Sequence, residues 1–592
     1  MKQSINCNIL WTELFVSALE KLGIKHACIS PGSRNTPLIV AFQRSSKIKS
    51  FVHIDERSSG FFALGLAKKT NRPVIVVTTS GTAVAELYPA IIEAYQQRNP
   101  LIICTADRPP NLLNTGANQT INQIDIFHNH IYKFYPLELP NINSKAFSKL
   151  LTVTKNAYSE AAEYRLPVHI NFPFDKPFEP SNKTSIIDLG YLSRIKEKFK
   201  NVSYSTVIKK TKKNDISYVL KKLKESEKTL ILVGPLKIEN KNIRTIFQFA
   251  KKINAPILAD GLSGFRFAKI NSKNLIANHS SFLRSDEIRE KLDPDLIIQI
   301  GAAPTSNSIL KFFKNSHAFK IIVNEYGELK DPSRTTDKII TAEFSQIFEE
   351  LYNLIDKKNK IKSDKKWFSK FLEIENQSEV IKQVNLKKAS FPFEGKIIND
   401  IINLAPESSN IMVSNSLSVR DVDAFASLSN KNINIYSNRG ASGIDGITST
   451  AAGVNADVKN PTFLITGDLA FYHDITGLLS LKKYSIPLIV ILFNNNGGGI
   501  FELLPIAKEK IDFQNYFKTP LMIDFKSIVT GFSGNYSLVK NGKDFSTEVK
   551  RAVKRKTFTV LEIKIDSKKS LQNRKNIWND ISNASNLLIN EN

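Results

Sequence analysis

Short, almost purely apolar segments recur along this 592-residue chain, and each of them ends in a turn-forming residue before a helical stretch begins. VIVVT at 74–78 and LIVILF at 488–493 are examples. A strand that is apolar at every position has both faces buried, which is typical of a parallel sheet covered by helices on each side. The pattern therefore predicts an α/β fold built from doubly wound parallel sheets.

These strands fall into three stretches, and the chain is longer than a single hydrophobic core usually grows. We predict three domains, at residues 1–180, 205–355 and 385–592. The charged segment 356–368 leads out of the second domain through a helix, and we place a linker near 355–390. The predicted strands lie at 25–30, 73–81, 100–110 and 167–175, then at 228–235, 255–261, 295–301 and 320–327, and finally at 410–418, 433–440, 461–468, 486–496 and 557–566.

The formal net charge of +26 raises the question of a nucleic-acid partner. The lysines alternate with Asn, Glu and Ser, as in KKLKESEK at 221–228, which is typical of solvated helix faces. The sequence shows neither a basic strip interleaved with aromatic residues nor a helix-turn-helix pattern. We therefore predict that the protein binds no nucleic acid.

The three cysteines, Cys7, Cys28 and Cys104, stand far apart and match no metal or disulfide spacing. We expect them to be structural, in a protein of the reducing cytoplasm. The sequence has no run of about 18 apolar residues, which predicts no integral membrane segment. Its beginning, MKQSINCNILWTELF, lacks the apolar core and cleavage site of a signal peptide.

An acidic turn and an asparagine cluster end two neighbouring strands of the third stretch. Asp468 follows the strand FLIT, and Asn495 lies between LIVILF and three glycines. Ligands of open parallel sheets bind at the carboxyl ends of the strands, and Mg²⁺ prefers such oxygen ligands together with phosphate. The same residues also favour ordinary turns, and the local sequence leaves both interpretations open.

Gly467-Asp468 followed by Asn-Asn resembles the motif of the thiamine diphosphate enzymes. The resemblance implies that Asp468, Asn495 and the carbonyl of Gly497 hold Mg²⁺, with Mn²⁺ as an alternative ion. These enzymes also need a carboxylate beside the aminopyrimidine ring of the cofactor, and Glu56 before FFALGLA is the candidate. A glutamate at a helix start can instead serve the helix dipole.

A set of motifs appears in order: SPGSRNTPL (30–38), DERSSGFFALGLA (55–67), TSGTAVAELYPAIIEA (79–94), ADRPP (106–110), GANQTINQ (116–123), SNRGASGIDG (437–446), GDLAFYHD (467–474) and NNNGGGIFELLP (494–505). Together they resemble the family of 2-succinyl-5-enolpyruvyl-6-hydroxy-3-cyclohexene-1-carboxylate synthases of menaquinone biosynthesis, well in the first and third stretches and poorly in the middle one. The resemblance implies thiamine diphosphate-dependent decarboxylation of 2-oxoglutarate and 1,4-addition to isochorismate. It further implies a homodimer or dimer of dimers whose active site is shared between chains.

Both implied substrates are dicarboxylates, which arginine forks bind bidentately. Four arginines inside the matching motifs stand at or near carboxyl ends of predicted strands, although a single arginine there more often makes a surface ion pair. The resemblance assigns substrate contacts to Arg34, Arg108, Arg420, Arg439, Ser33, Asn118, Gln119 and Ser416. It assigns catalysis to Glu56, Arg34, Arg108 and Gln119. It assigns cofactor contacts to Glu56, Ser416, Arg439, Ile444, Asp468, Asn495, Gly497, Ile500, Phe501 and Leu504.

One departure from the family lies in the middle stretch, where a basic residue is expected after the strand DLIIQIG. This chain has Asn307 and Ser308 there. Either Lys311, Lys314 or Arg284 substitutes, or this chain binds a substrate carboxylate more weakly. His473 matches a family position, and we expect it to be structural.

Two alternatives stay open. An acetolactate-synthase-like enzyme would keep the cofactor residues without needing the arginines. A nucleic-acid-binding protein on a decayed fold would not need Glu56 or Asp468, and both residues are present.

Overall fold

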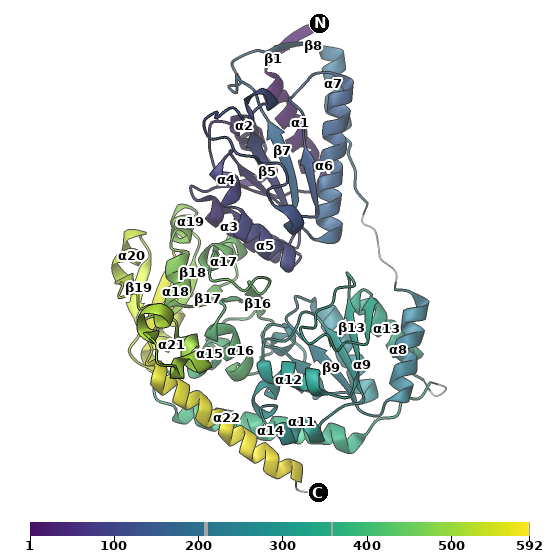
Figure 1. Ribbon diagram of the computed structural model, residues 1–592, viewed down its shortest axis with the longest axis vertical. Coiled ribbons are helices and arrows are strands. Elements are labelled where there is room, and N and C mark those ends of the chain that lie inside the picture. The colour runs from purple at the N-terminus through teal and green to yellow at the C-terminus, as the bar shows by residue number, and fades with distance from the viewer. Residues whose placement is uncertain (206–210, 357–358, 591–592) are drawn as a thin grey trace. The chain divides into compact units, whose positions relative to one another are not determined.

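The computed structural model describes residues 1–205, 211–356 and 359–590, and it contains three six-stranded sheets with helices between the strands (Figure 1). The chain divides into two compact units. Unit 1 comprises Met1–Val207, Asn438–Lys459 and Ala470–Leu488, and unit 2 comprises Ile208–Ser437, Asn460–Leu469 and Ile489–Asn592. The α/β prediction is confirmed. In the part of the chain that the structure describes, no helix is long and apolar enough to cross a bilayer.

Unit 1 contains a parallel sheet in the order β3-β2-β4-β5-β7-β6 and a small antiparallel pair, β1 with β8. Its elements are β1 (Lys2–Ile5), α1 (Cys7–Leu22), β2 (His26–Ile29), α2 (Thr36–Arg44), β3 (Lys49–Val52), α3 (Glu56–Thr70), β4 (Val74–Thr78), α4 (Thr82–Ala85), α5 (Tyr88–Gln96), β5 (Leu101–Asp107), β6 (Lys133–Pro136), α6 (Ser144–Tyr164), β7 (Val168–Pro173), β8 (Ser185–Asp188), α7 (Leu189–Lys200), α17 (Ile447–Asn455) and α19 (Gly477–Lys483).

Both faces of this sheet are covered, as the all-apolar strands require. Alternate residues of β2, β4, β5 and β7 pack with α1, α2, α6 and α7 in one core, and α3 lies against β2, β4 and β5. On its far side α3 packs closely along α17. A Cβ on Gly65 would lie 2.1 Å from the carbonyl oxygen of Thr450, and one on Gly453 would lie 2.0 Å from that of Phe62. Glycine therefore lets the two backbones touch.

Unit 2 contains two sheets, in the orders β11-β10-β9-β12-β13-β14 and β16-β15-β17-β18-β20-β19. Its elements are α8 (Lys213–Glu225), β9 (Thr229–Val233), α9 (Asn240–Ile253), β10 (Ile257–Ala259), β11 (Leu275–Ile276), α10 (His279–Phe282), α11 (Asp286–Lys291), β12 (Leu296–Ile300), α12 (Asn307–Asn315), β13 (Phe319–Asn324), β14 (Lys338–Thr341), α13 (Phe344–Leu354), α14 (Lys365–Lys388), α15 (Glu394–Leu404), β15 (Asn410–Val413), α16 (Leu417–Phe425), β16 (Asn434–Ser437), β17 (Thr462–Gly467), β18 (Leu488–Asn494), α20 (Phe525–Gly531), β19 (Asn535–Leu538), α21 (Gly542–Ala552), β20 (Thr559–Lys564) and α22 (Ser567–Asn590).

The first of these sheets packs on α8, α9 and α13 through one face and on α10 to α12, α14 and α22 through the other. The second packs on α15, α16 and α21 through one face. The segment predicted as a linker contains α14, which lies along α22. A short helix, α18 (Asp468–His473), begins where β17 ends and spans the boundary between the two units.

Candidate functional site

The catalytic candidate of unit 1 is Glu56, the first residue of α3. The side chain of Asp55 caps this helix by accepting a hydrogen bond of 3.1 Å from the backbone N–H of Ser58. Burial raises the pKa of the half-buried Glu56 carboxyl, against the opposing effect of its own backbone N–H, and the charges of Asp55 and Glu86 raise it further. Such a carboxyl is suited to share a proton with a ring nitrogen.

Arg34 and Arg108 lie together at the carboxyl edge of the same sheet. Arg34 follows β2, donates to the carbonyl of Phe174 at 2.7 Å and stacks 4.7 Å from the ring centre of Phe178. Its buried Nε finds no hydrogen-bond partner among the residues that the structure describes. Burial lowers the pKa of Arg34, and the neighbouring charge of Arg108 lowers it further. Two adjacent guanidinium groups with an unused donor favour an anion between them.

Arg108 also fixes the loop that carries the predicted amide side chains. It donates to the hydroxyl of Ser80 and, at 2.7 Å, to the carbonyl of Asn118. The hydroxyl of Ser80 donates in turn to the carbonyl of Gln119, 3.1 Å away. Ser33, Asn118 and Gln119 are exposed at this edge. The sequence analysis thus named residues that the structure brings together in unit 1.

A layer of supporting residues behind Arg108 was not predicted. One carboxylate oxygen of Asp107 accepts from the backbone N–H of Arg108 at 2.7 Å, and the other accepts from the amide of Asn171 at 2.8 Å. Gln123 donates to Asn171 at 2.9 Å and accepts from the N–H of Gly81 at 3.1 Å. Two of its members stand in quoted motifs, Asp107 in ADRPP and Gln123 in GANQTINQ, whereas Asn171 lies outside them.

The loop between β16 and α17, which carries Arg439 and Ile444, is held by a buried glutamate of α5. Glu93 accepts hydrogen bonds from the backbone N–H groups of Gly440 at 2.8 Å and Ala441 at 2.7 Å. Burial raises the pKa of Glu93, and the charge of the buried Lys68 opposes that shift. Ile444 remains 37% exposed.

Asp468 anchors the predicted metal loop in unit 2. Its carboxylate accepts from the backbone N–H groups of Leu469 and Gly497, each at 2.8 Å. Burial raises the pKa of Asp468 to about 6. Gly497 has φ 128°, and a Cβ there would lie 2.0 Å from the carbonyl oxygen of Lys518, so the loop requires glycine. The same carbonyl accepts from the N–H of Gly498 at 2.7 Å.

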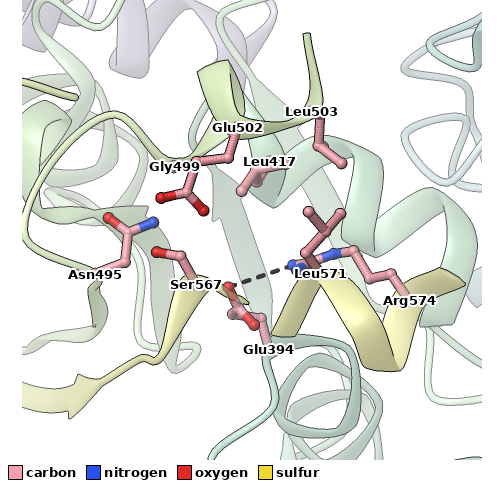
Figure 2. A pocket seen from close by; sticks show the side chains of 9 residues that line it. All are labelled: Glu394, Leu417, Asn495, Gly499, Glu502, Leu503, Ser567, Leu571 and Arg574. Carbon is pink, nitrogen blue, oxygen red and sulfur yellow. Dashed lines mark ion pairs between the residues drawn. The ribbon is translucent and has the colours of Figure 1, made fainter. Parts of the chain in front are cut away.

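Asn495 faces a small pocket on the other side of this loop, and Figure 2 shows the side chains that surround it. The pocket is lined by Glu394, Leu417, Asn495, Gly499, Glu502, Leu503, Ser567, Leu571 and Arg574. The ammonium of Lys518 pairs with Glu502 at 2.6 Å. The guanidinium of Arg574 lies 3.3 Å from Glu394 and donates to Asp421 at 2.9 Å. Arg574 was not predicted, because its acidic partners Asp421 and Glu394 lie more than 150 positions away.

The start of α16 and the segment after the glycines complete the residues predicted in unit 2. Ser416 precedes α16 with φ 68°, and its carbonyl accepts from Arg420 at 2.6 Å. Phe501 packs on Phe517 with ring centres 5.6 Å apart. Ile500 is partly buried and Leu504 is exposed.

The metal site would rely on more than acidic residues. The described residues include no group of three or more His, Cys, Asp or Glu side chains that could hold an ion. The predicted ligands would instead offer one charged and two neutral oxygen atoms, from Asp468, the amide of Asn495 and the carbonyl of Gly497. Such a set suits Mg²⁺ completed by phosphate oxygens. A cation would also offset the burial that raises the pKa of Asp468.

Two of the basic residues considered for the middle stretch, Lys311 and Arg284, have other partners. Lys311 pairs with Asp286 at 2.8 Å on the surface, and the guanidinium of Arg284 stacks 3.6 Å from the ring centre of Trp578. Ser308 donates to the carbonyl of Ser280 at 2.9 Å. The residue that replaces the expected basic group stays a prediction.

Comparison with known families gives three matches. Residues 11–126 match the N-terminal TPP binding domain of thiamine pyrophosphate enzymes, residues 194–413 match the middle domain of thiamine pyrophosphate enzymes, and residues 428–563 match the C-terminal TPP binding domain. The middle stretch, which the sequence motifs resembled poorly, therefore matches as well.

Full-length relatives carry one name. The chain is 34% identical over 571 residues to a 2-succinyl-5-enolpyruvyl-6-hydroxy-3-cyclohexene-1-carboxylate synthase of Bacillus cytotoxicus, covering 95% of each chain. It is 36% identical to a synthase of the same name from Bacillus velezensis, covering 94% of this chain and 95% of that one. It is 34% identical to the synthase of Haloquadratum walsbyi, covering 95% of this chain and 96% of that one.

Proposed function

Because the chain belongs to the thiamine pyrophosphate enzymes, in the family of 2-succinyl-5-enolpyruvyl-6-hydroxy-3-cyclohexene-1-carboxylate synthases, we propose that its substrates are 2-oxoglutarate and isochorismate. The protein is a thiamine diphosphate-dependent transferase of menaquinone biosynthesis that forms a carbon–carbon bond. In the proposed reaction 2-oxoglutarate loses CO₂, and its four-carbon remainder is joined to isochorismate by 1,4-addition.

The paired guanidinium groups of Arg34 and Arg108 carry the proposal for the substrates. They lie close enough for the charge of one to lower the pKa of the other, and Arg34 keeps an unused donor among the described residues. A carboxylate would neutralise this repulsion and accept from both forks. A monocarboxylate substrate would leave one cation uncompensated, which disfavours the acetolactate-like alternative. Arg420 and Arg439 are proposed to serve the second carboxylate.

We propose that Asp468, Asn495 and the carbonyl of Gly497 hold Mg²⁺, with Mn²⁺ as a substitute, beside the diphosphate of the cofactor. When bound, thiamine diphosphate supplies the electron sink for decarboxylation. Glu56 shares a proton with its aminopyrimidine ring, and its raised pKa suits that task.

The remaining predicted residues would position and enclose the cofactor. Ser416 and Arg439 lie in turns at strand ends suited to the diphosphate. Ile444 supports the bend of the cofactor, and Ile500, Phe501 and Leu504 shield the reacting carbon from water.

The assembly and location follow as further proposals. We propose a homodimer or a dimer of dimers in which Glu56 and Asp468 of one active site come from different chains, as the family resemblance implies. The three cysteines are unpaired, which supports a cytoplasmic location.

The identity of the reaction product tests the proposed function. The protein is incubated with thiamine diphosphate, Mg²⁺, 2-oxoglutarate and isochorismate, and the product is identified by mass. We expect a single adduct that has lost one CO₂, and no adduct when pyruvate replaces 2-oxoglutarate. Use of pyruvate at a rate equal to that with 2-oxoglutarate would support the acetolactate-like alternative instead.

A further inference from the structure

The segment that leads from β3 into α3 is fastened by side chains of α19 and the residue that follows it. The carbonyl of Val52 accepts from the hydroxyl of Tyr484 and from the ammonium of Lys483, each at 2.9 Å. The next residue, His53, is buried, and its Nδ1 lies 3.0 Å from the hydroxyl of Ser480. This ring is neutral, because burial lowers the pKa of His53 to about 3.

The first turn of α3 is fastened in the same way by residues 473–476. The hydroxyl of Thr476 donates to the carboxylate of Asp55 at 2.6 Å. The guanidinium of Arg57 donates to the carbonyl of His473 at 3.0 Å. These contacts flank Glu56 on both sides in the sequence.

A fully buried chain of hydrogen bonds forms the innermost contact. Both carboxylate oxygens of Asp474 accept from Ser449, one from the backbone N–H at 2.6 Å and one from the hydroxyl at 2.9 Å. Since that hydroxyl donates to Asp474, it accepts from the hydroxyl of Ser58, 2.8 Å away. Asp474, Ser449 and Ser58 together connect the residue after α18 to the first turn of α3.

Two residues of this segment are left to point outward. Ile54 is 75% exposed, and Glu56 is half-buried. Among the described residues, only its own backbone N–H donates to the Glu56 carboxylate. The contacts at Val52, His53, Asp55, Arg57 and Ser58 therefore fix the backbone on both sides of a carboxylate that stays available to a ligand.

We propose that Asp474 is a positioning residue for Glu56, acting through Ser449 and Ser58 on the first turn of α3. The inference rests on the proposed role of Glu56 toward thiamine diphosphate. Asp474 does not touch the reacting atoms; it sets where the Glu56 carboxylate stands. It also follows directly on α18, whose first residue is the proposed metal ligand Asp468, so one short segment of the chain carries both functions.

The variant Asp474→Asn keeps the shape of the side chain but removes an acceptor for Ser449. We expect exchange of the C2 proton of bound thiamine diphosphate to slow by about tenfold or more, because a displacement of about 1 Å can cost 10²-fold. The affinity for the cofactor, measured by calorimetry, should stay within about threefold, because the diphosphate and metal contacts remain.

Asp457→Asn is the matched control. Asp457 follows α17, contacts His26 at 3.0 Å and Lys49 at 3.1 Å, and has no contact with the first turn of α3. Its exchange rate should equal that of the wild type. Ser58→Ala provides a second variant if Asp474→Asn folds poorly. If Asp474 and Ser58 act through the same series of hydrogen bonds, the double variant should exchange the C2 proton no more slowly than the slower single variant.

Two results would overturn the inference. Normal exchange per bound cofactor in Asp474→Asn, beside a wild type that accelerates exchange, would show that Asp474 only stabilises the fold. Additive effects of Asp474→Asn and Ser58→Ala on the exchange rate would show that the two residues do not act through the same series of hydrogen bonds. A wild type that binds the cofactor without accelerating exchange would instead overturn the proposed function, and this inference with it.

Discussion

Burial should make the proposed metal ligand Asp468 sensitive to pH. Its folded-state pKa of about 6 lies above the ordinary value, so the folded protein holds this proton more tightly than the unfolded chain. The contribution of Asp468 to stability without metal therefore falls as pH rises from about 4 to about 6. Mg²⁺ needs the ionised form, so its affinity should rise as pH rises to about 6 and level off above it.

Calorimetric titration of Mg²⁺ in the presence of thiamine diphosphate checks this expectation. Below pH 6 we expect a loss of about tenfold in affinity per pH unit, as one proton competes with one ion. Asp468→Ala should bind weakly at every pH. Unchanged affinity in Asp468→Ala would show that Asp468 is not a ligand.

Glu56→Gln tests the proton-sharing role by keeping the shape and removing the acid. We expect cofactor affinity to survive and C2 proton exchange to fall by roughly 10² or more, the scale of general acid–base catalysis. Exchange is followed by transfer of deuterium into the bound cofactor. Near-normal exchange in Glu56→Gln would assign Glu56 to helix capping.

Arg108→Lys tests whether the guanidinium fork recognises substrate. A point charge cannot bind a carboxylate bidentately, so kcat/KM for 2-oxoglutarate should fall by about 10- to 100-fold. The thermal midpoint should barely change. Arg98→Lys is the control, since Arg98 also donates to a backbone carbonyl, that of Tyr164 at 2.7 Å, but stands before β5. Equal losses of stability and activity in Arg108→Lys would assign Arg108 to the scaffold.

At the scale of the elements, the carboxylate of Glu93 connects α5 to the loop after β16. In Glu93→Gln a single oxygen remains for the N–H groups of Gly440 and Ala441, and we expect a loss of about 1–3 kcal/mol in the free energy of unfolding. Because the loop carries Arg439 and Ile444, KM for thiamine diphosphate should rise more than KM for 2-oxoglutarate.

Glu160→Gln is the control for Glu93→Gln. Glu160 lies on α6 and accepts from the hydroxyl of Tyr135 at 2.8 Å, away from this loop. Steady-state kinetics with each substrate varied in turn separates the two KM values. A rise of both by the same factor would contradict a specific role of α5 in holding the loop.

The central strands could be predicted from the sequence, whereas several edge strands could not. β4, β5, β9 and β12 are buried at every position, so their sequences are apolar throughout. β3 and β14, at the edges of their sheets, each bury only one residue fully and mix Lys with apolar residues. A single sequence does not distinguish such short segments of mixed polarity from loops.

The helix α14 was predicted as part of a linker because of its charge. Its buried residues include Trp367, Phe371 and Ile374, which recur at helical spacing. A helix was expected where the charged segment leaves the second domain. Its packing along α22 could not be predicted, because the two helices lie far apart in the sequence.

The candidate site shows the same limit. Glu56, Arg34 and Arg108 stand in local motifs, and the sequence therefore identified them. Ser449 contacts Ser58 of α3 across 391 positions, and Asp474 acts on α3 only through Ser449. No local pattern reports such a pair. The groups proposed to touch ligands therefore stand in local motifs, whereas the groups that hold them in place depend on contacts between distant segments.

At the scale of the whole molecule, the two units are interleaved along the sequence. Unit 1 takes Asn438–Lys459 and Ala470–Leu488 from the third stretch, while Asp468 and Asn495 belong to unit 2. Glu56 and the proposed metal ligands therefore lie in different units. An active site completed by a second chain is the assembly proposed above for this protein.

Mixing two inactive variants tests that assembly. If Glu56 of one chain serves the metal site of its partner, a dimer of Glu56→Gln with Asp468→Ala contains one intact site and one doubly altered site. Random exchange makes half of the dimers mixed, so activity should recover to about a quarter of the wild type. The measurement is product formation after subunit exchange has been verified by differently tagged chains. No recovery in verified mixed dimers would place both residues of each site on one chain.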